Sequence, residues 1–377
     1  MVPYGRQQID ERDIEAVVQV LKSDWLTTGP KIEEFETAVA SFVGAKHGVA
    51  VSNGTAALHA AMYALGIGPG DEVIVPPMTF IATANAVVYQ GGTPVFADVD
   101  PGTLLIDPDE VERRITTKTK AILAVDYAGQ PCNYERLQSL ARRNGLHLVT
   151  DACHALGAEY KGKKIGSIAD MTVFSFHPVK HITTGEGGMI TTDDPELAAR
   201  MRRFRNHGIA TDFRQREKTG SWFYEMADLG YNYRITDIQC ALGISQMAKF
   251  PGWLDRRRQI AGRYDTAFLG SECTVPLAVS ADVRHAYHLY VVKLGAGTGA
   301  KSRAEAFAEF RRRGIGVNVH YIPVHLHPFY RDKFGTGAGK CPVAESEYEK
   351  IISLPMFSGL TYSEVDTVIQ AAKDILG

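Results

Sequence analysis

The feature that most constrains the fold is a regular alternation of short apolar runs with helical patterns between residues 72 and 192. The runs have the length of strands, and we expect strands at 72–75, 94–99, 121–126, 146–151, 172–176 and 189–192. Amphipathic patterns such as 135–143 and 196–204 lie between most of these runs. Strands that alternate with helices favour a doubly wound, mainly parallel sheet. The sequence therefore predicts an α/β protein built on such a sheet.

The alternation ends near residue 250. A long helical pattern at 236–263 is interrupted by Pro251-Gly252. Beyond it we expect a strand at 287–292, a helix at 303–313, a second strand at 316–321 and a closing helix at 363–375. We therefore predict two domains, a large one over residues 1–250 and a smaller α+β domain over residues 251–377.

Composition narrows the function classes. The formal net charge of the 377 residues is -2, so no strong positive field favours nucleic acid or an anionic membrane. The apolar runs are far too short to span a bilayer, and the N-terminus lacks the pattern of a signal peptide. The 5 cysteines are widely spaced, which indicates neither a disulfide framework nor a zinc ribbon. We expect a cytoplasmic protein without a membrane or nucleic-acid partner.

Two candidate catalytic residues follow apolar strands. Asp151 ends the run 146–151, and Lys180 comes shortly after the run 172–176. The carboxyl ends of parallel strands meet at one edge of a sheet, where ligands of open α/β sheets bind. We therefore expect the two side chains near one another at that edge, although an acid and a lysine there could also form a simple salt bridge.

A candidate phosphate site lies earlier in the chain. Asn53-Gly54-Thr55-Ala56 opens a helix with small residues, whose free amides and hydroxyl would suit a phosphate, although an Asn helix cap explains the pattern equally well. Ser175 offers a second hydroxyl just before Lys180. Phe80 could stack on a ring or serve as a core aromatic.

Together these residues suit a cofactor with one phosphate, one aromatic ring and one aldehyde, which is pyridoxal phosphate. An amine is needed for a Schiff base with the aldehyde, and Lys180 supplies it. A carboxylate, Asp151, is needed to keep the pyridine nitrogen protonated so that the ring acts as an electron sink.

Several motifs carry a specific resemblance. They are Asp151-Ala-Cys-His154-Ala-Leu-Gly157, Ser175-Phe-His-Pro-Val-Lys180, Thr184-Gly-Glu-Gly-Gly188 and Gly230-Tyr-Asn-Tyr-Arg234. In this order the chain resembles, over essentially its whole length, the sugar-nucleotide aminotransferases. These belong to the fold type I, aspartate aminotransferase-like class of pyridoxal phosphate enzymes. The resemblance implies a large domain with a seven-stranded, mainly parallel sheet.

The resemblance also implies roles for individual residues. It makes Lys180, Asp151 and His154 the catalytic residues, with His154 against the ring oxygen of the cofactor. The implied cofactor-binding residues are Gly54, Thr55, Ala56, Phe80, Asp151, His154, Ser175, Lys180 and Asn232. Asn232 matches a residue that reaches the phosphate of the neighbouring subunit, so a homodimer with shared active sites is expected. The implied substrate-binding residues are Thr27, Thr28, His320, Tyr321 and His327.

The implied reaction has two halves. L-glutamate leaves its amino group on the cofactor, which becomes pyridoxamine phosphate, and this group then passes to a nucleotide-linked keto sugar. His154 and the His177-Pro-Val-Lys-His181 context look most like the pseudaminic-acid pathway enzyme. That enzyme aminates C4 of a UDP-linked 4-keto-6-deoxy-N-acetyl-hexose, giving UDP-4-amino-4,6-dideoxy-N-acetyl-β-L-altrosamine.

Several alternatives stay open. Within the class they are aminotransferases of the bacillosamine, perosamine and TDP-sugar 3- or 4-amino types. Outside it, a pyridoxal phosphate sugar dehydratase would carry histidine in place of Lys180, and a pyridoxal phosphate-binding regulatory protein would lack turnover. A nicotinamide-dependent oxidoreductase lacks its glycine fingerprint here. His177 and His181 have the spacing of a metal pair, but Pro178 disfavours a regular helix, so no metal is expected.

Overall fold

A seven-stranded sheet forms the centre of the computed structural model, which describes residues 1–210, 216, 220–295 and 302–376. Its order is β1-β9-β8-β5-β4-β2-β3. The strands are β1 (His47–Val51), β2 (Glu72–Val75), β3 (Thr93–Phe96), β4 (Thr119–Val125), β5 (His147–Asp151), β8 (Met171–Ser175) and β9 (Gly188–Thr192). Strands β3, β2, β4, β5 and β8 run parallel, whereas β9 and β1 are antiparallel to their neighbours. The predicted mainly parallel sheet is confirmed, and the sequence pattern missed only β1 among these strands.

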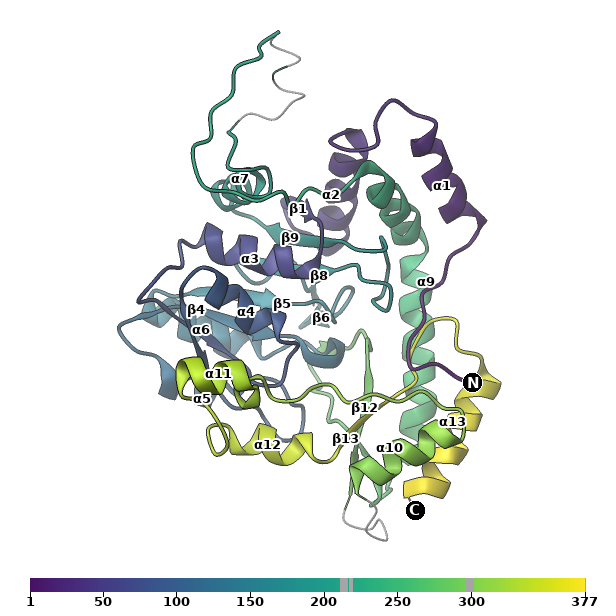
Figure 1. Ribbon diagram of the computed structural model, residues 1–377. Coiled ribbons are helices and arrows are strands. Elements are labelled where there is room, and N and C mark those ends of the chain that lie inside the picture. The colour runs from purple at the N-terminus through teal and green to yellow at the C-terminus, as the bar shows by residue number, and fades with distance from the viewer. Residues whose placement is uncertain (211–215, 217–219, 296–301, 377) are drawn as a thin grey trace.

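Helices cover this sheet (Figure 1). They are α2 (Pro30–Val43), α3 (Gly54–Ala64), α4 (Ala82–Tyr89), α6 (Tyr134–Asn144) and α7 (Pro195–Phe204). Helix α5 (Pro108–Arg114) packs on α6, and α1 (Glu11–Leu21) packs on the long helix α9 (Asp237–Phe268). Helix α3 packs against β8 and β9, and α6 packs against β4 and β5. A short 3-10 turn, η1 (Tyr127–Gly129), follows β4. The packing of α3 on β8 brings the amino end of that helix to the carboxyl end of the strand.

Smaller elements follow in the last third of the chain. A three-stranded sheet has the order β10-β12-β13, with β10 (Thr274–Pro276), β12 (Tyr290–Leu294) and β13 (Ile351–Leu354). A second small sheet joins β11 (Val283–Arg284) to β6 (Glu159–Tyr160) and β7 (Lys163–Lys164), which come from the connection between β5 and β8. The helices here are α10 (Arg303–Arg312), η2 (Val324–Leu326), α11 (Pro328–Phe334), α12 (Pro342–Tyr348) and α13 (Tyr362–Leu376).

The strand predicted at 316–321 was wrong. The structure has only isolated bridges there, such as Asn318 with Ser353, and the partner of β12 is instead β13. The segment runs along the wall of the large cavity described below, where Asn318, His320 and Tyr321 contribute side chains. Apolar and polar residues alternate in this segment and mimic the period of a strand, although Asn318, Val319, His320 and Tyr321 all line the cavity.

The long helix α9 (Asp237–Phe268) is continuous, so the predicted interruption at Pro251-Gly252 was also wrong. A proline inside a helix costs one hydrogen bond and about 3 kcal/mol. Packing on both sides of Pro251 offsets this cost. Phe250 and Leu254 belong to the hydrophobic core of the large sheet, whereas Ile260 and Tyr264 belong to the core of the C-terminal elements. We propose that the two lobes meet within α9, between Leu254 and Ile260.

In the described part of the chain, no helix combines the length and the apolar character needed to cross a membrane.

Candidate active site

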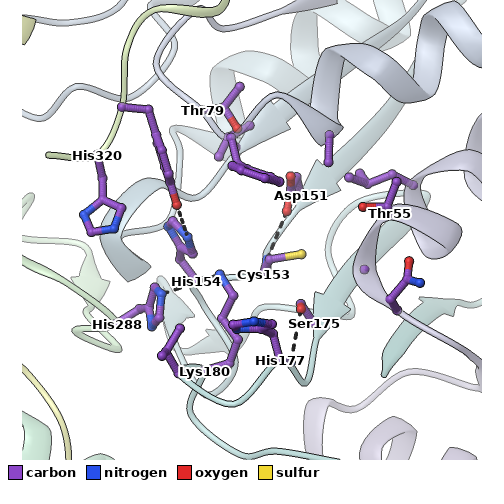
Figure 2. Close-up of a pocket in the computed structure, with 18 of the residues that line it drawn as sticks. Thr55, Thr79, Asp151, Cys153, His154, Ser175, His177, Lys180, His288 and His320 are labelled. Carbon is purple, nitrogen blue, oxygen red and sulfur yellow. Dashed lines mark hydrogen bonds between the residues drawn. The ribbon is translucent and has the colours of Figure 1, made fainter. Parts of the chain in front are cut away.

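The ends of β5 and β8 form the floor of a cavity of about 760 Å³. The two strands are paired in register, with Asp151 opposite Val173, so Asp151 and Ser175 lie at the same edge of the sheet. This cavity brings together most of the predicted site residues: Gly54, Thr55, Ala56, Phe80, Asp151, His154, Ser175, Lys180, His320 and Tyr321 (Figure 2). The expected convergence at the carboxyl edge of the sheet is thus present.

Asp151 is held by two donors. The Thr83 hydroxyl donates to its Oδ2 at 2.7 Å, and the Cys153 amide donates to its Oδ1 at 3.1 Å. The Thr79 hydroxyl shares a 2.8 Å hydrogen bond with that of Thr83 and extends the chain of donors. A carboxylate has about four acceptor positions, so Asp151 can still accept a hydrogen bond from a ligand in the cavity.

Lys180 reaches the cavity from the loop after β8. Burial in the cavity wall lowers the pKa of its amine below the ordinary value, while Cys153 and Asp151 act in the opposite direction. A lowered pKa increases the fraction of neutral amine, which is the nucleophilic form. Nζ of Lys180 lies 3.5 Å from Nε2 of His288.

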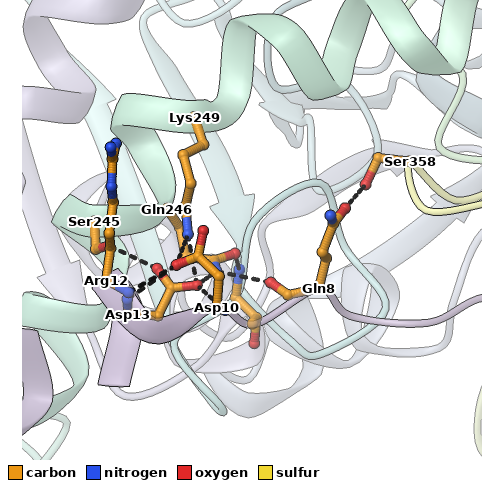
Figure 3. A network of polar contacts seen from close by, with 9 residues as sticks. Gln8, Asp10, Arg12, Asp13, Ser245, Gln246, Lys249 and Ser358 are labelled. Atoms are coloured by element: carbon orange, nitrogen blue, oxygen red, sulfur yellow. Dashed lines mark hydrogen bonds and ion pairs between the residues drawn. The ribbon is translucent and has the colours of Figure 1, made fainter. Parts of the chain in front are cut away.

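A polar network supports the loop that carries Lys180 (Figure 3). The Thr183 amide donates to Oε1 of Gln246 at 3.4 Å, and Nε2 of Gln246 donates to the fully buried Asp13 at 2.7 Å. Nζ of Lys249 lies 2.7 Å from the same carboxylate. The network thus ties the loop after Lys180 to α9 and to α1.

Histidines form one wall of the cavity. Nε2 of His154 lies 3.1 Å from the Tyr321 hydroxyl, and the rings of His154 and His288 are 4.4 Å apart. Burial lowers the pKa of His154 and His288 well below the ordinary value, and it lowers the pKa of His320 to about 3. These imidazoles are therefore neutral near pH 7, and each offers one donor and one acceptor nitrogen.

The amino end of α3 provides the phosphate seat. The Asn53 side chain accepts from the Ala56 amide at 2.8 Å, which leaves the amides of Gly54 and Thr55 without a protein acceptor among the described residues. A Cβ placed on Gly54 would lie 3.0 Å from the Cβ of Ser175, so glycine keeps this end of the cavity open. Free amides at a helix amino end, beside two hydroxyls, fit a phosphate group.

Four predicted substrate or cofactor residues lie outside this cavity within the chain. Thr27 forms an isolated bridge with Thr236, and Thr28 lines a separate cavity of about 600 Å³. Asn232 forms an isolated bridge with Asn206. His327 lines an apolar cavity of about 420 Å³, which shares Tyr89 with the main cavity.

The sequence motifs missed other cavity residues: Tyr4, Thr79, Cys153, His288 and Asn318. Cys153 lies inside the Asp151–His154 motif, so its position was available to the sequence reasoning. His288 and Asn318 lie in segments that the sequence predicts only as strands, at 287–292 and 316–321, and the tertiary fold brings them to the cavity that Lys180 lines. His181, the second member of the apparent metal pair, turns away and contacts the carbonyl oxygen of Ala286 at 3.1 Å.

A lysine, a buried carboxylate and a phosphate seat around one cavity at the edge of a parallel sheet define the site of a pyridoxal phosphate enzyme. The residues fit each part of that cofactor. Comparison with known proteins makes the assignment more specific. The sequence profile of the DegT/DnrJ/EryC1/StrS aminotransferase family matches residues 7–373.

Individual relatives agree with this match. The spore coat polysaccharide biosynthesis protein SpsC of Bacillus subtilis (strain 168) is 43% identical over 377 residues, which cover 100% of this chain and 97% of SpsC. Spr1654 of Streptococcus pneumoniae, a protein assigned as a sugar aminotransferase, has a structure in its PMP form with a TM-score of 0.94 and 36% identity. That match covers 100% of this chain and 99% of Spr1654. A PLP form of Spr1654 has also been solved.

Helicobacter pylori PseC, an aminotransferase of pseudaminic acid biosynthesis, has a TM-score of 0.91 and 34% identity, with coverage of 100% and 99%. The chain therefore belongs to the DegT/DnrJ/EryC1/StrS family and is a pyridoxal phosphate-dependent sugar aminotransferase.

Proposed function

We propose that this chain transfers the amino group of L-glutamate to C4 of a UDP-linked 4-keto-6-deoxy-N-acetyl-hexose. The product would be UDP-4-amino-4,6-dideoxy-N-acetyl-β-L-altrosamine, an intermediate of pseudaminic acid biosynthesis. The observation that carries the proposal is the single cavity that joins Lys180 and Asp151 to the polar side chains of His320 and Tyr321. The similarity to PseC supports the choice of sugar.

The proposed cofactor contacts follow from the cavity. Bound pyridoxal phosphate supplies an electron sink that allows a proton to leave the carbon next to the amino group. The amides of Gly54 and Thr55 and the hydroxyls of Thr55 and Ser175 would hold its phosphate, and Ala56, whose amide donates to Asn53, lines the same end of the cavity. Asp151 would keep the pyridine nitrogen protonated.

The other ring contacts follow from the remaining walls. Phe80 is 55% exposed and lies 6.0 Å from the Tyr321 ring, so it is free to cover a planar ligand. His154, with a neutral imidazole, would contact the ring oxygen of the cofactor.

Lys180 carries the proton transfers in this proposal. Its Nζ is the amine that would hold the aldehyde of the cofactor. The free amine would accept a proton from the amino-acid α-carbon and release it again. The lowered pKa of Lys180 favours this role, since a neutral amine is needed for both bonding and proton uptake.

The substrate-facing residues come from both lobes. His320 and Tyr321 approach from the C-terminal segment, and neutral imidazole and phenol groups suit the hydroxyls and the N-acetyl group of a sugar better than a second charge would. His327, Thr27 and Thr28 are proposed to contact the substrate outside the main cavity. Asn232 is proposed to serve the neighbouring subunit of a homodimer, which would complete each site.

A second candidate is favoured by SpsC, which has a higher identity to this chain than PseC has. In this alternative the chain aminates another nucleotide-linked keto sugar at C3 or C4. The two candidates share the cofactor, the donor and the roles of Lys180 and Asp151. They differ only in the sugar.

A substrate panel separates these candidates. The protein loaded with pyridoxal phosphate should lose its visible absorption band on addition of L-glutamate. The band should recover with a UDP-linked 4-keto-6-deoxy-N-acetyl-hexose faster than with TDP- or GDP-linked 4-keto sugars. Mass spectrometry and NMR of the product should place the new amine at C4. Faster recovery with a TDP- or GDP-sugar would refute the proposed substrate and leave the reaction class intact.

A further inference from the structure

His288 is a buried cavity residue that no sequence motif indicated. Its side chain is 5% exposed, and its Nε2 lies 3.5 Å from Nζ of Lys180 (Figure 2). Nδ1 of the same ring has no hydrogen-bond partner in the part of the chain that the structure describes. The ring therefore directs its polar contact to the amine of Lys180.

The backbone around His288 is fixed from several sides. The amide of Leu289 donates to the carbonyl of Ala128 at 3.2 Å, and Nη1 of Arg257 contacts the carbonyls of Tyr287 and His288 at 3.1 and 3.4 Å. Tyr287 has a φ of 49°, which places it in the left-handed region that non-glycine residues rarely adopt. Such conformations persist where the surroundings over-determine them, often at functional sites.

The charges near His288 keep its ring neutral. Burial has the largest effect on its pKa, and Lys180, His154, His181 and Arg257 all lower that pKa further. A neutral imidazole with its hydrogen on Nδ1 has a lone pair on Nε2, so it can accept a hydrogen bond from an amine.

We propose that His288 is a positioning residue that acts through Lys180. Its neutral Nε2 accepts a hydrogen bond from the Lys180 amine and keeps Nζ directed into the cavity whenever that amine is free. The inference rests on the proposed role of Lys180 as the residue that bonds the cofactor and moves the proton. His288 itself forms and breaks no covalent bond.

The need for such a residue follows from the lysine side chain. A lysine amine sits on a long flexible stem, so a free amine without an acceptor would leave its working position. An ordered position of the proton-transfer group is worth a large factor in rate. A hydrogen bond from a charged donor is also stronger than one from a neutral donor. We therefore expect the hydrogen bond to His288 to keep the pKa of Lys180 higher than burial alone would.

Three substitutions test the contact. His288→Gln places a terminal amide near the position of Nε2, whereas the shorter His288→Asn places it near Nδ1, away from Lys180. His288→Leu removes the polar group and retains most of the volume. His325→Gln is the matched control, because His325 is also buried, lies outside the cavity and pairs with Glu345.

The first readout needs no cofactor. In the full chain without pyridoxal phosphate, lysines labelled by ¹³C reductive methylation are titrated by NMR, and the Lys180 signal is assigned with a Lys180→Arg protein. We expect the Lys180 pKa to fall by about one unit in His288→Leu and His288→Asn, since a hydrogen bond to a charged group changes protonation about tenfold. His288→Gln should restore most of this shift, and His325→Gln should cause none.

The second readout is the kinetics of the loaded enzyme with L-glutamate. We expect kcat to fall about tenfold or more in the Leu and Asn variants at nearly constant KM, with recovery in the Gln variant. Equal behaviour of the Gln and Asn variants, or an unchanged Lys180 pKa and kcat in both Leu and Asn variants, would overturn the inference. Turnover by Lys180→Arg at the rate of the unmodified protein would instead overturn the proposed function. The two failures are thus distinguishable.

Discussion

The hydrogen bond from Thr83 to Asp151 gives the sharpest test of how the site is held. Thr83→Val removes the hydroxyl that donates to Oδ2 at 2.7 Å and retains the shape of the side chain. Thr83 is completely buried, so bulk water has no direct access to replace the lost donor. A hydrogen bond to a charged group contributes about 1.5–3 kcal/mol. We therefore expect the free energy of unfolding of the cofactor-free protein to fall by about 2 kcal/mol.

Thr172 provides a matched control for Thr83, and it lies in β8, the strand next to the one that ends in Asp151. It is also completely buried, but its hydroxyl has no hydrogen-bond partner among the described residues. Thr172→Val removes a buried hydroxyl without a partner, so the free energy of unfolding of this variant should stay the same or rise. Urea denaturation of both variants, followed in parallel, gives the comparison.

The same pair should differ in cofactor binding. Without Thr83, the carboxylate of Asp151 loses one of its two fixed contacts and is free to turn away from the cavity. We expect the Kd for pyridoxal phosphate to rise about tenfold in Thr83→Val, which equals about 1.4 kcal/mol, and to stay unchanged in Thr172→Val. Equal effects of the two substitutions on stability and on Kd would refute the reasoning.

Three further predictions concern other parts of the chain. Gly54→Ala places a Cβ 3.0 Å from that of Ser175, and such overpacking costs about 1–3 kcal/mol. An absorbance titration should therefore show cofactor binding weakened about tenfold, and unchanged binding would contradict the proposed phosphate site. Burial lowers the pKa of Lys180 in the folded protein, so the charged lysine destabilises the fold at pH values below that pKa. This destabilisation disappears as the pH rises to the pKa that the lysine has in the unfolded chain. Lys180→Met should therefore stabilise the cofactor-free protein at pH 7, and the gain measured by urea denaturation should shrink by about pH 10. Lys249→Met leaves the buried carboxylate of Asp13 without its cation at 2.7 Å and should lower the free energy of unfolding by about 3 kcal/mol. Lys249→Arg retains a cation and should lose less, and equal losses in the two variants would contradict this prediction.

Much of the site was predictable because it follows the ends of strands. Asp151 and Ser175 end β5 and β8, and the parallel pairing of these strands brings their ends together. The helix start at Gly54 was visible in the small residues after Asn53. In each case a regular pattern of apolar residues and the point where that pattern ends predict the position of the site residue.

Other features could not be read from local patterns. Thr83 lies 68 residues from Asp151 in sequence and His288 lies 108 residues from Lys180, and both contacts depend on how distant segments pack. The continuity of α9 through Pro251 also depends on packing, since the local rule predicts a break. The residues that a second subunit would supply, such as Asn232, stay predictions for the same reason.

The central claim is that Lys180 is the residue that bonds pyridoxal phosphate. Borohydride reduction of the loaded protein makes this bond permanent, and peptide mapping by mass spectrometry then locates it. The account predicts a phosphopyridoxyl group on the peptide that contains Lys180 and no such label in a Lys180→Ala protein. A label on another lysine, or unchanged labelling of the Lys180→Ala protein, would contradict it.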